Sequence, residues 1–308
     1  MQRGGEALKL TVRGANLDAR PLLRGMMQGG ERASGAATSK SSMSFDDFDL
    51  DLKSSLVTGY GKQILSNVDL KMERRNGHPR ALLLGAMFGR EQLVAQMKRQ
   101  TSQAPEVEIS TNDAGSFFSF LDIYKRMESG VLNATFQLSP GRADGTMQVR
   151  DFYLKNEPAV RQLMTQGVVR PDASGAMHFD HDTVRFSRLQ AGFTWAGGRL
   201  ALREGVMSGP EIGLTFDGAL DFSRDRVDVS GAYVPAYALN NLLGNIPLFG
   251  EFLGGRHEGL FALNYRITGD INAPSVVVNP LSAIAPGLLR KIMGVMDGTQ
   301  RPPDAGGR

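Results

Sequence analysis

Apolar and polar residues alternate at every second position through most of this chain. Segments 8–12 and 48–52 show the pattern in its simplest form, with Leu, Val or Phe at one set of positions and Lys, Thr or Asp at the other. A period of two indicates a strand with one buried face. The same or a similar rhythm predicts further strands at 68–72, 82–84, 92–98, 107–109, 132–138, 177–179, 184–186, 191–195, 199–202, 212–216, 219–222, 227–229, 260–267 and 276–278.

Turn residues separate these strands at short intervals, and Asn76-Gly77 is a strong hairpin signal. One short helix is predicted near Pro21 and a last one from Pro286, and between them a helix, a glycine and a strand follow one another three times. Because the short helices are separated by hairpins, we expect a mainly β protein, not a parallel βαβ sheet. Its strands would form a long antiparallel meander, with a few short helices packed at its ends or on its face. The expected caps and ends of the three repeated helices are Asp113 and Gly130, Asn156 and Gly167, and Pro235 and Gly244.

The domain organisation is simple. We expect residues 1–296 to form one elongated domain and the Pro/Gly-rich residues 297–308 to form a disordered tail. Residues 29–42 are rich in Gly and Ser, which predicts a flexible loop within the domain. No apolar run approaches about 18 residues, the length that a transmembrane helix needs, and the first residues lead directly into a strand where a signal peptide would carry an apolar segment.

Composition narrows the classes of partner. The 308 residues include 35 Lys and Arg against 32 Asp and Glu, for a net charge of +3, and the charges are interspersed. Proteins that bind nucleic acid cluster their basic residues on one face, so we expect no nucleic-acid partner. The absence of cysteine excludes disulfides, thiol catalysis and cysteine metal sites.

Motifs for catalysis or for a cofactor are absent from the sequence: it has no phosphate-binding loop, no nucleophile elbow and no zinc-protease motif. Segment 178–182 reads His-Phe-Asp-His-Asp, which could hold zinc, but an exposed turn is the better explanation. Asp47, Asp49 and Asp51 share one side of a strand and could bind a cation, but a solvated face or a guarded sheet edge explains them better. We therefore expect a protein that is not an enzyme and has no cofactor and no metal.

The apolar sides of the strands allow two interpretations. They form either an ordinary core, with two sheets packed together or helices laid on a sheet, or an apolar trough that holds acyl chains. Periodicity alone does not separate the two.

Segment 234–296 carries the most distinctive sequence pattern, and it resembles the C-terminal region of the AsmA-like family of bacterial envelope proteins, which includes TamB-type relatives. A looser likeness extends upstream through the strand rhythm and residues 48–52. The motifs that carry the resemblance are Ile-Pro-Leu-Phe-Gly at 246–250, Gly-Leu-Phe at 259–261, Tyr265, Gly269, Pro274, Asn-Pro-Leu-Ser at 279–282 and Ala-Pro-Gly at 285–287.

The resemblance implies a long, curved, mostly antiparallel sheet that forms an open groove. It also implies a role in moving phospholipid between the inner and outer membranes, or in assembling the outer membrane. Such a protein is periplasmic and attached to the inner membrane through an upstream anchor that is missing from this chain, so we expect the sequence to be a piece of a longer protein. Its partners would be phospholipid, a membrane surface and possible envelope proteins.

The resemblance and the alternation together indicate candidate site residues. We expect a continuous apolar face to bind lipid, and loop 246–253 and helix 286–296 to contact a membrane or a partner, although each of these segments could instead cap the core or fold back onto the sheet. The candidates for the lipid face are Phe136, Leu138, Phe261, Leu263 and Tyr265. The candidates for the membrane or partner contact are Leu248, Phe249, Phe252, Leu288, Leu289, Ile292 and Met293.

Three functions remain open. The leading one is a non-enzymatic envelope protein that binds lipid acyl chains in a hydrophobic β-groove and contributes to phospholipid transport. The alternative is a structural or assembly factor for outer-membrane biogenesis that acts through its sheet edges. An envelope hydrolase is the third, and it would need a polar cleft joining His178 to a distant serine or carboxylate.

Overall fold

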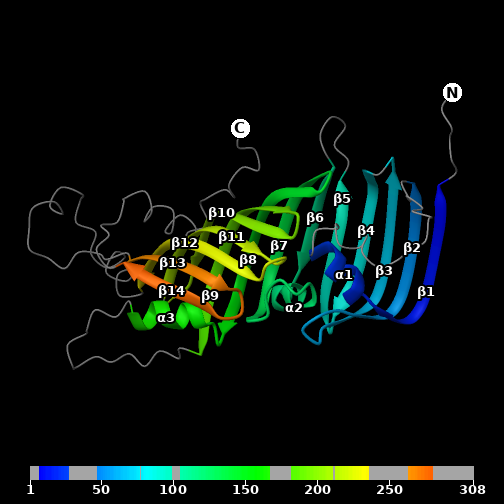
Figure 1. The fold of residues 1–308 in the computed structure, drawn as a ribbon. Coiled ribbons are helices and arrows are strands. Elements are labelled where there is room, and N and C mark those ends of the chain that lie inside the picture. The colour runs from blue at the N-terminus through cyan, green and yellow to red at the C-terminus, as the bar shows by residue number, and fades with distance from the viewer. Residues whose placement is uncertain are drawn as a thin grey trace, which may run out of the picture.

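The described part of the chain folds into one sheet of fourteen strands whose spatial order follows the sequence (Figure 1). The computed structural model describes residues 7–27, 47–76, 78–98, 105–166, 182–210, 212–235 and 263–279. Every pair of neighbouring strands from β2 to β14 is antiparallel. This arrangement confirms the predicted β meander with a few short helices.

The strands are β1 (Leu8–Asp18), β2 (Phe48–Thr58), β3 (Ile64–Arg75), β4 (His78–Phe88), β5 (Glu91–Lys98), β6 (Glu106–Thr111), β7 (Met127–Ser139), β8 (Arg142–Lys155), β9 (Thr183–Ala196), β10 (Arg199–Ser208), β11 (Ile212–Asp221), β12 (Arg226–Pro235), β13 (Leu263–Asp270) and β14 (Pro274–Asn279). The helices are α1 (Arg20–Met27), α2 (Ala114–Phe120) and α3 (Pro158–Gln166). Segments 184–186 and 191–195, predicted as separate strands, are two parts of β9, and 212–216 and 219–222 likewise fall largely within β11.

The first strand pair departs from the antiparallel rule. β1 runs parallel to β2, with Leu8 opposite Phe48 and Leu10 opposite Leu50. Parallel neighbours need a crossover between them, and α1 lies in that connection. The sequence pattern did not reveal this pairing, because a period of two is the same in parallel and antiparallel strands.

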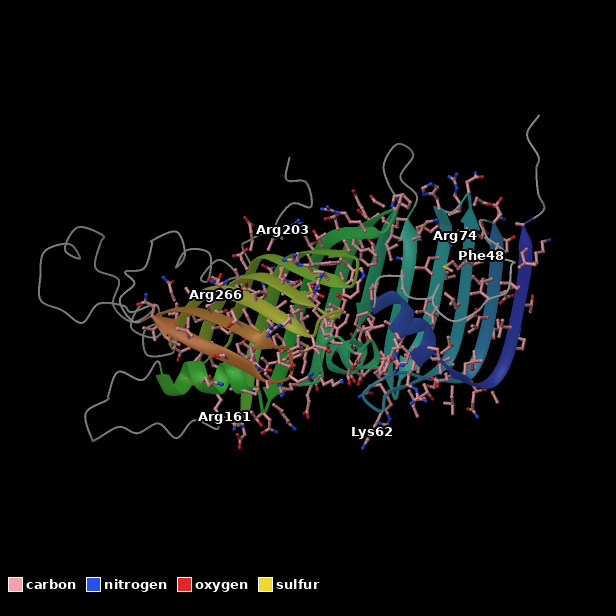
Figure 2. All side chains as sticks on the ribbon, viewed as in Figure 1. Phe48, Lys62, Arg74, Arg161, Arg203 and Arg266 are labelled. Carbon is pink, nitrogen blue, oxygen red and sulfur yellow. The ribbon has the colours of Figure 1, made fainter. Side chains whose placement is uncertain are left out.

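The two faces of the sheet differ in polarity. Residues directly opposite on neighbouring strands point to the same face, and one face carries charged pairs that join adjacent strands. Figure 2 labels Arg203 and Arg266, which belong to this polar face. The pairs between neighbouring strands on this face include Arg13–Asp51, Lys53–Asp69, Lys98–Glu108 and Arg266–Asp228. Asp49 and Asp51 are thus paired with arginines, Arg75 and Arg13.

The three helices lie against the opposite, apolar face. Leu23 of α1 packs with Val57, Leu65 and other residues of β2–β5 in one buried cluster. A second cluster joins α2, α3 and strands β7–β14, with Leu163 of α3 and Val276 of β14 among its members. No second sheet covers the apolar face in the described part of the chain. An ordinary core would consist either of two packed sheets or of helices laid on a sheet. In the described part of the chain only the second kind occurs.

Several strands contain residues in the left-handed backbone conformation. Asp151 in β8 has a φ of 53°, and the buried Val149 and Phe152 on either side of it belong to the same cluster. Strict alternation would place residues three apart on opposite faces, so the irregularity at Asp151 returns Phe152 to the core. Gly130 lies beside it in β7 with a φ of 97°, and a Cβ there would stand 2.9 Å from the Cβ of Phe152.

Two of the predicted helix boundaries are wrong. Gly130 does not end α2, which stops at Phe120, because the chain turns at Asp122 with a φ of 63°. Asn156 does not cap α3: its φ is 50°, and the Glu157 carboxylate instead accepts a hydrogen bond from the backbone N–H of Ala159. Pro235 is the last residue of β12, and the helix predicted after it lies outside the described residues.

Other expectations also concern residues that the structure does not describe. These are the loop 29–42, the helix end Gly167, the strand 177–179, the segment 178–181, the loop 246–253, the helix 286–296, the tail 297–308 and Phe261. The membrane-contact candidates Leu248, Phe249, Phe252, Leu288, Leu289, Ile292 and Met293 are among them, and they stay predictions.

Candidate functional site

A row of small and apolar side chains crosses the sheet on the face that the helices partly cover. From β6 to β14 each member is directly opposite the next, and the row continues over β1–β4 in the same way. We call the side of the sheet that carries this row the apolar face. Its members are Leu10, Leu50, Met72, Leu82, Met97, Val107, Phe136, Gly145, Phe193, Leu202, Gly218, Val229, Ile267 and Val276.

The row places four of the five lipid-face candidates on one side of the sheet. Phe136 belongs to the row, and Leu138 follows it by two residues on β7. Ile267 belongs to the row on β13, and Tyr265 and Leu263 precede it by two and four residues. The four described residues therefore lie on one side of the sheet, although β7 and β13 lie six strands apart. Their role in binding lipid stays a prediction.

The apolar face divides into a sealed part and an accessible part. Leu263 and Tyr265 are 3% and 5% exposed and belong to the cluster that α3 covers. The hydroxyl of Tyr265 donates a hydrogen bond to the carbonyl oxygen of Thr215 at 2.8 Å, and burial raises the pKa of this hydroxyl above its ordinary value. Phe136 and Leu138, by contrast, are only half-buried. One part of the apolar face is thus a covered core, and another part stays accessible.

Aromatic side chains line the accessible part. Phe136 and Phe193 meet edge to face with ring centroids 5.9 Å apart, and Trp195 and Phe222 contact each other at 5.6 Å. Trp195 lies in a second row that runs from β7 to β12 and contains no charged residue, and all members of this row are half-buried. These members are Leu138, Ala143, Trp195, Leu200, Leu220 and Val227.

The accessible part continues toward β1. Leu50, Met72 and Leu82 are half-buried, and Leu10 is 40% exposed. At the end of this region Arg74 of β3 lies directly opposite Phe48 of β2 (Figure 2), and its side chain is exposed. The accessible apolar surface therefore extends across strands of both halves of the sheet, with a cation at one rim.

An open pocket of about 510 Å³ lies where the β2–β3 turn, α2 and the start of β7 meet, and its lining includes Lys62, Asp113 and Ser116. Its carboxylates have partners already. Asp113 accepts a hydrogen bond from the backbone N–H of Ser116 at 2.9 Å, and Glu128 pairs with Lys155 at 2.7 Å. No histidine is among the residues that line this pocket.

On the polar face, the carboxylate of Asp144 is stabilised by neighbouring side chains. The Arg142 guanidinium and the Thr194 hydroxyl donate hydrogen bonds to Asp144, and the arginine above all lowers the pKa of this carboxyl to about 2. Among the described residues, no group of three or more His, Asp or Glu side chains is placed to hold a metal ion. Within the same residues, no helix has the length and apolarity needed to cross a membrane.

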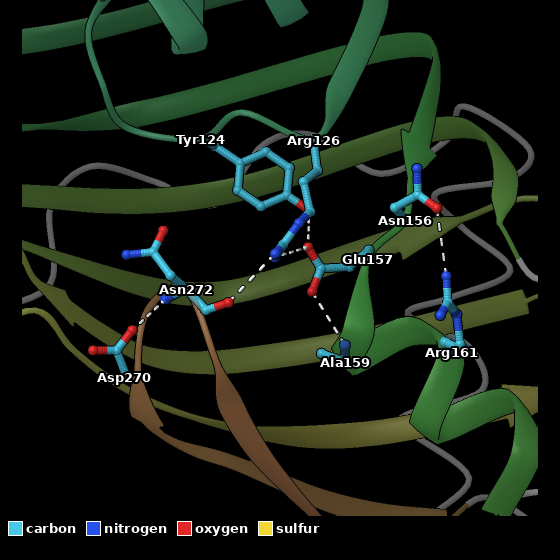
Figure 3. Close-up of polar contacts among 8 residues, drawn as sticks. All are labelled: Tyr124, Arg126, Asn156, Glu157, Ala159, Arg161, Asp270 and Asn272. Carbon is cyan, nitrogen blue, oxygen red and sulfur yellow. Dashed lines mark hydrogen bonds and ion pairs between the residues drawn. The ribbon is translucent and has the colours of Figure 1, made fainter. Parts of the chain in front are cut away.

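Sequence reasoning missed one polar cluster. Tyr124, Arg126 and Glu157 meet beside the β13–β14 turn (Figure 3), although each residue alone carries no recognisable signal. Burial and the neighbouring Glu157 carboxylate raise the pKa of Tyr124 well above its ordinary value.

Comparison of the chain with protein-family models, with curated proteins and with solved structures finds no match.

Proposed function

We propose that this chain is a non-enzymatic, AsmA-like protein that binds lipid acyl chains on the accessible part of its apolar face and contributes to phospholipid transport between the inner and outer membranes. The observation that carries the proposal is the apolar row that runs over β1–β4 and again over β5–β14, with half-buried aromatic side chains and no second sheet on it in the described part of the chain. The periplasmic location rests on the family resemblance of segment 234–296 alone.

The dimensions of the face suit acyl chains. Fourteen strands at about 4.8 Å spacing make a surface roughly 60 Å long. One leaflet of a bilayer has a hydrocarbon thickness of about 15 Å, so an acyl chain of that length laid across the strands covers only about three of them. Several acyl chains can therefore lie on the face, and the continuous row offers one chain successive positions.

The energetics suit reversible binding. Each methylene removed from water contributes roughly 0.8 kcal/mol, so burying about ten of them contributes about 8 kcal/mol. Association costs a comparable amount in lost translational and rotational freedom. A lipid held by its tails alone is thus held only weakly and can exchange, as a transport protein requires.

Native mass spectrometry of the purified chain tests the proposal. We expect co-purified phospholipid with the wild type and markedly less with Phe193→Asp, because a carboxylate on the apolar face opposes acyl-chain burial. Leu83→Asp is the matched control, since Leu83 is 52% exposed on the polar face. Absence of lipid from the wild type, or equal loss in both variants, would contradict the proposal.

The position of β1 at the edge of the described sheet supports a second candidate function, that of an assembly factor that pairs with envelope proteins through its sheet edge. β1 has eleven residues and pairs only with β2 among the described strands. Exposed edge strands are templates for strand addition. A photo-crosslinking residue at Thr11 should then capture an envelope protein in cells, whereas one at Gln96 in the middle of the sheet should not.

A further inference from the structure

The β13–β14 hairpin at the end of the sheet contacts segments that are far away in the sequence. Nη2 of Arg126, just before β7, donates a hydrogen bond to the backbone carbonyl of Asn272 in the β13–β14 turn at 3.3 Å (Figure 3). Val276 of β14 also packs in one buried cluster with Leu163 of α3. The β13–β14 hairpin therefore closes against the loop that precedes β7 and against α3.

Glu157 holds this closure together. One of its carboxylate oxygens accepts a hydrogen bond from the Tyr124 hydroxyl at 2.5 Å and lies 3.5 Å from the Arg126 guanidinium. The other oxygen accepts the backbone N–H of Ala159 at 3.1 Å. The Glu157 side chain is only 10% exposed, and a buried carboxylate of this kind needs all its partners. We call Tyr124, Arg126, Glu157 and Asn272 the latch.

The hairpin is placed so that it can move alone. It lies at the end of the sheet, and β12 is the only described strand that pairs with it. A rotation about the β12–β13 boundary would separate the hairpin from α3 and break the hydrogen bond from Tyr265 to Thr215 of β11, without opening any other strand pair. The side chains that it would uncover include Leu263, Tyr265 and Val276, which belong to the sealed part of the apolar face.

We propose that the β13–β14 hairpin is a movable cover closed by the latch, and that its opening extends the accessible apolar face to the last strands, so that acyl chains pass on or off the sheet at this end. This inference rests on the proposed function, because it assigns a route to the same lipid. In this proposal, the sealed part of the apolar face belongs to the same lipid-binding surface as the accessible part. It is inaccessible to lipid while the hairpin is closed.

Hydrogen exchange of the lipid-free protein tests the latch. Arg126→Met keeps the aliphatic stem and removes both polar contacts, and Glu157→Gln removes the charge. We expect each change to speed amide exchange in β13 and β14 about tenfold, with β2–β5 unchanged. Asp228→Asn is the control, since it removes the exposed pair with Arg266 that also joins β12 to β13. Unchanged exchange in the hairpin, or equal acceleration throughout the sheet, would overturn the latch.

Crosslinking tests the route. The chain has no cysteine, so an Arg126→Cys, Asn272→Cys double variant can be locked with a flexible bis-maleimide. We expect the locked protein to take up a fluorescent phospholipid from vesicles at least severalfold more slowly than the same variant before locking. Equal uptake by both forms overturns the cover and leaves the proposed function standing. If neither the wild type nor the unlocked variant takes up lipid, the proposed function fails, and the lipid route fails with it.

Discussion

Phe136 on β7 and Phe193 on β9 contact each other edge to face across the strand that separates them. Both are directly opposite Gly145 of β8, and their ring centroids are 5.9 Å apart. Strands two apart are separated by almost 10 Å, so the rings can meet only because the residue between them has no side chain. The accessible apolar face is therefore smooth at this point, because the two aromatic rings meet across Gly145.

A side chain at position 145 should destabilise the sheet. A Cβ on Gly145 would lie 2.2 Å from the carbonyl oxygen of Thr135 and 2.4 Å from the Cβ of Phe136. We expect Gly145→Ala to lower the free energy of unfolding by about 1–3 kcal/mol, the usual cost of overpacking. Gly85→Ala on β4 is the matched control, since a Cβ there meets nothing within 4 Å. Equal denaturation midpoints for the two variants would contradict the prediction.

The sealed and accessible parts of the apolar face should respond differently to the same charge. Leu263→Asp places a carboxylate at a site that is 3% exposed, and we expect a loss of about 4 kcal/mol or more in unfolding free energy. Phe136→Asp, on the half-buried part, should leave the protein folded and reduce the lipid retained. Thermal melts and lipid extraction measure both effects, and unfolding of the Phe136 variant would show that this part is sealed too.

The cap of α2 should contribute measurably to stability. Oδ1 of Asp113 accepts the backbone N–H of Ser116 at 2.9 Å. Asp113→Ala should cost about 1 kcal/mol, whereas Asp113→Asn, which retains a capping oxygen, should cost little. Chemical denaturation of the three proteins makes the comparison, and an equal loss in both variants would assign the effect to the charge instead of the cap.

Asp144 should contribute to acid sensitivity. Its folded-state pKa of about 2 lies below that of an ordinary aspartate, because Arg142 and Thr194 stabilise the carboxylate. The folded state therefore gains stability from Asp144 above about pH 4 and loses it as the pH falls toward 2. The unfolding free energy of Asp144→Asn should fall less steeply over this interval than that of the wild type. Parallel pH profiles would contradict this.

Local rules were enough to predict the elements. Alternation predicted β2, β7 and β13 with the correct residues on the apolar side, and Asp113 was recognised as the cap of α2. These features depend on side chains within a few residues of one another, where strand and cap geometry is fixed by the backbone. The irregularities at Gly130 and Asp151 were missed, because the left-handed residues that create them have no fixed sequence signature there.

Only the tertiary structure decided which parts of the apolar face are covered and which stay accessible. Phe136 and Leu263 have the same alternation, yet one is half-buried and the other is sealed. The difference comes from α3 and the β13–β14 hairpin, and the contact that closes them joins Arg126 to Asn272, 146 residues apart. The sequence determined on its own which side of each strand is apolar, because that depends on a period of two. What covers that side depends on distant segments meeting in space, and no local pattern encodes such a contact.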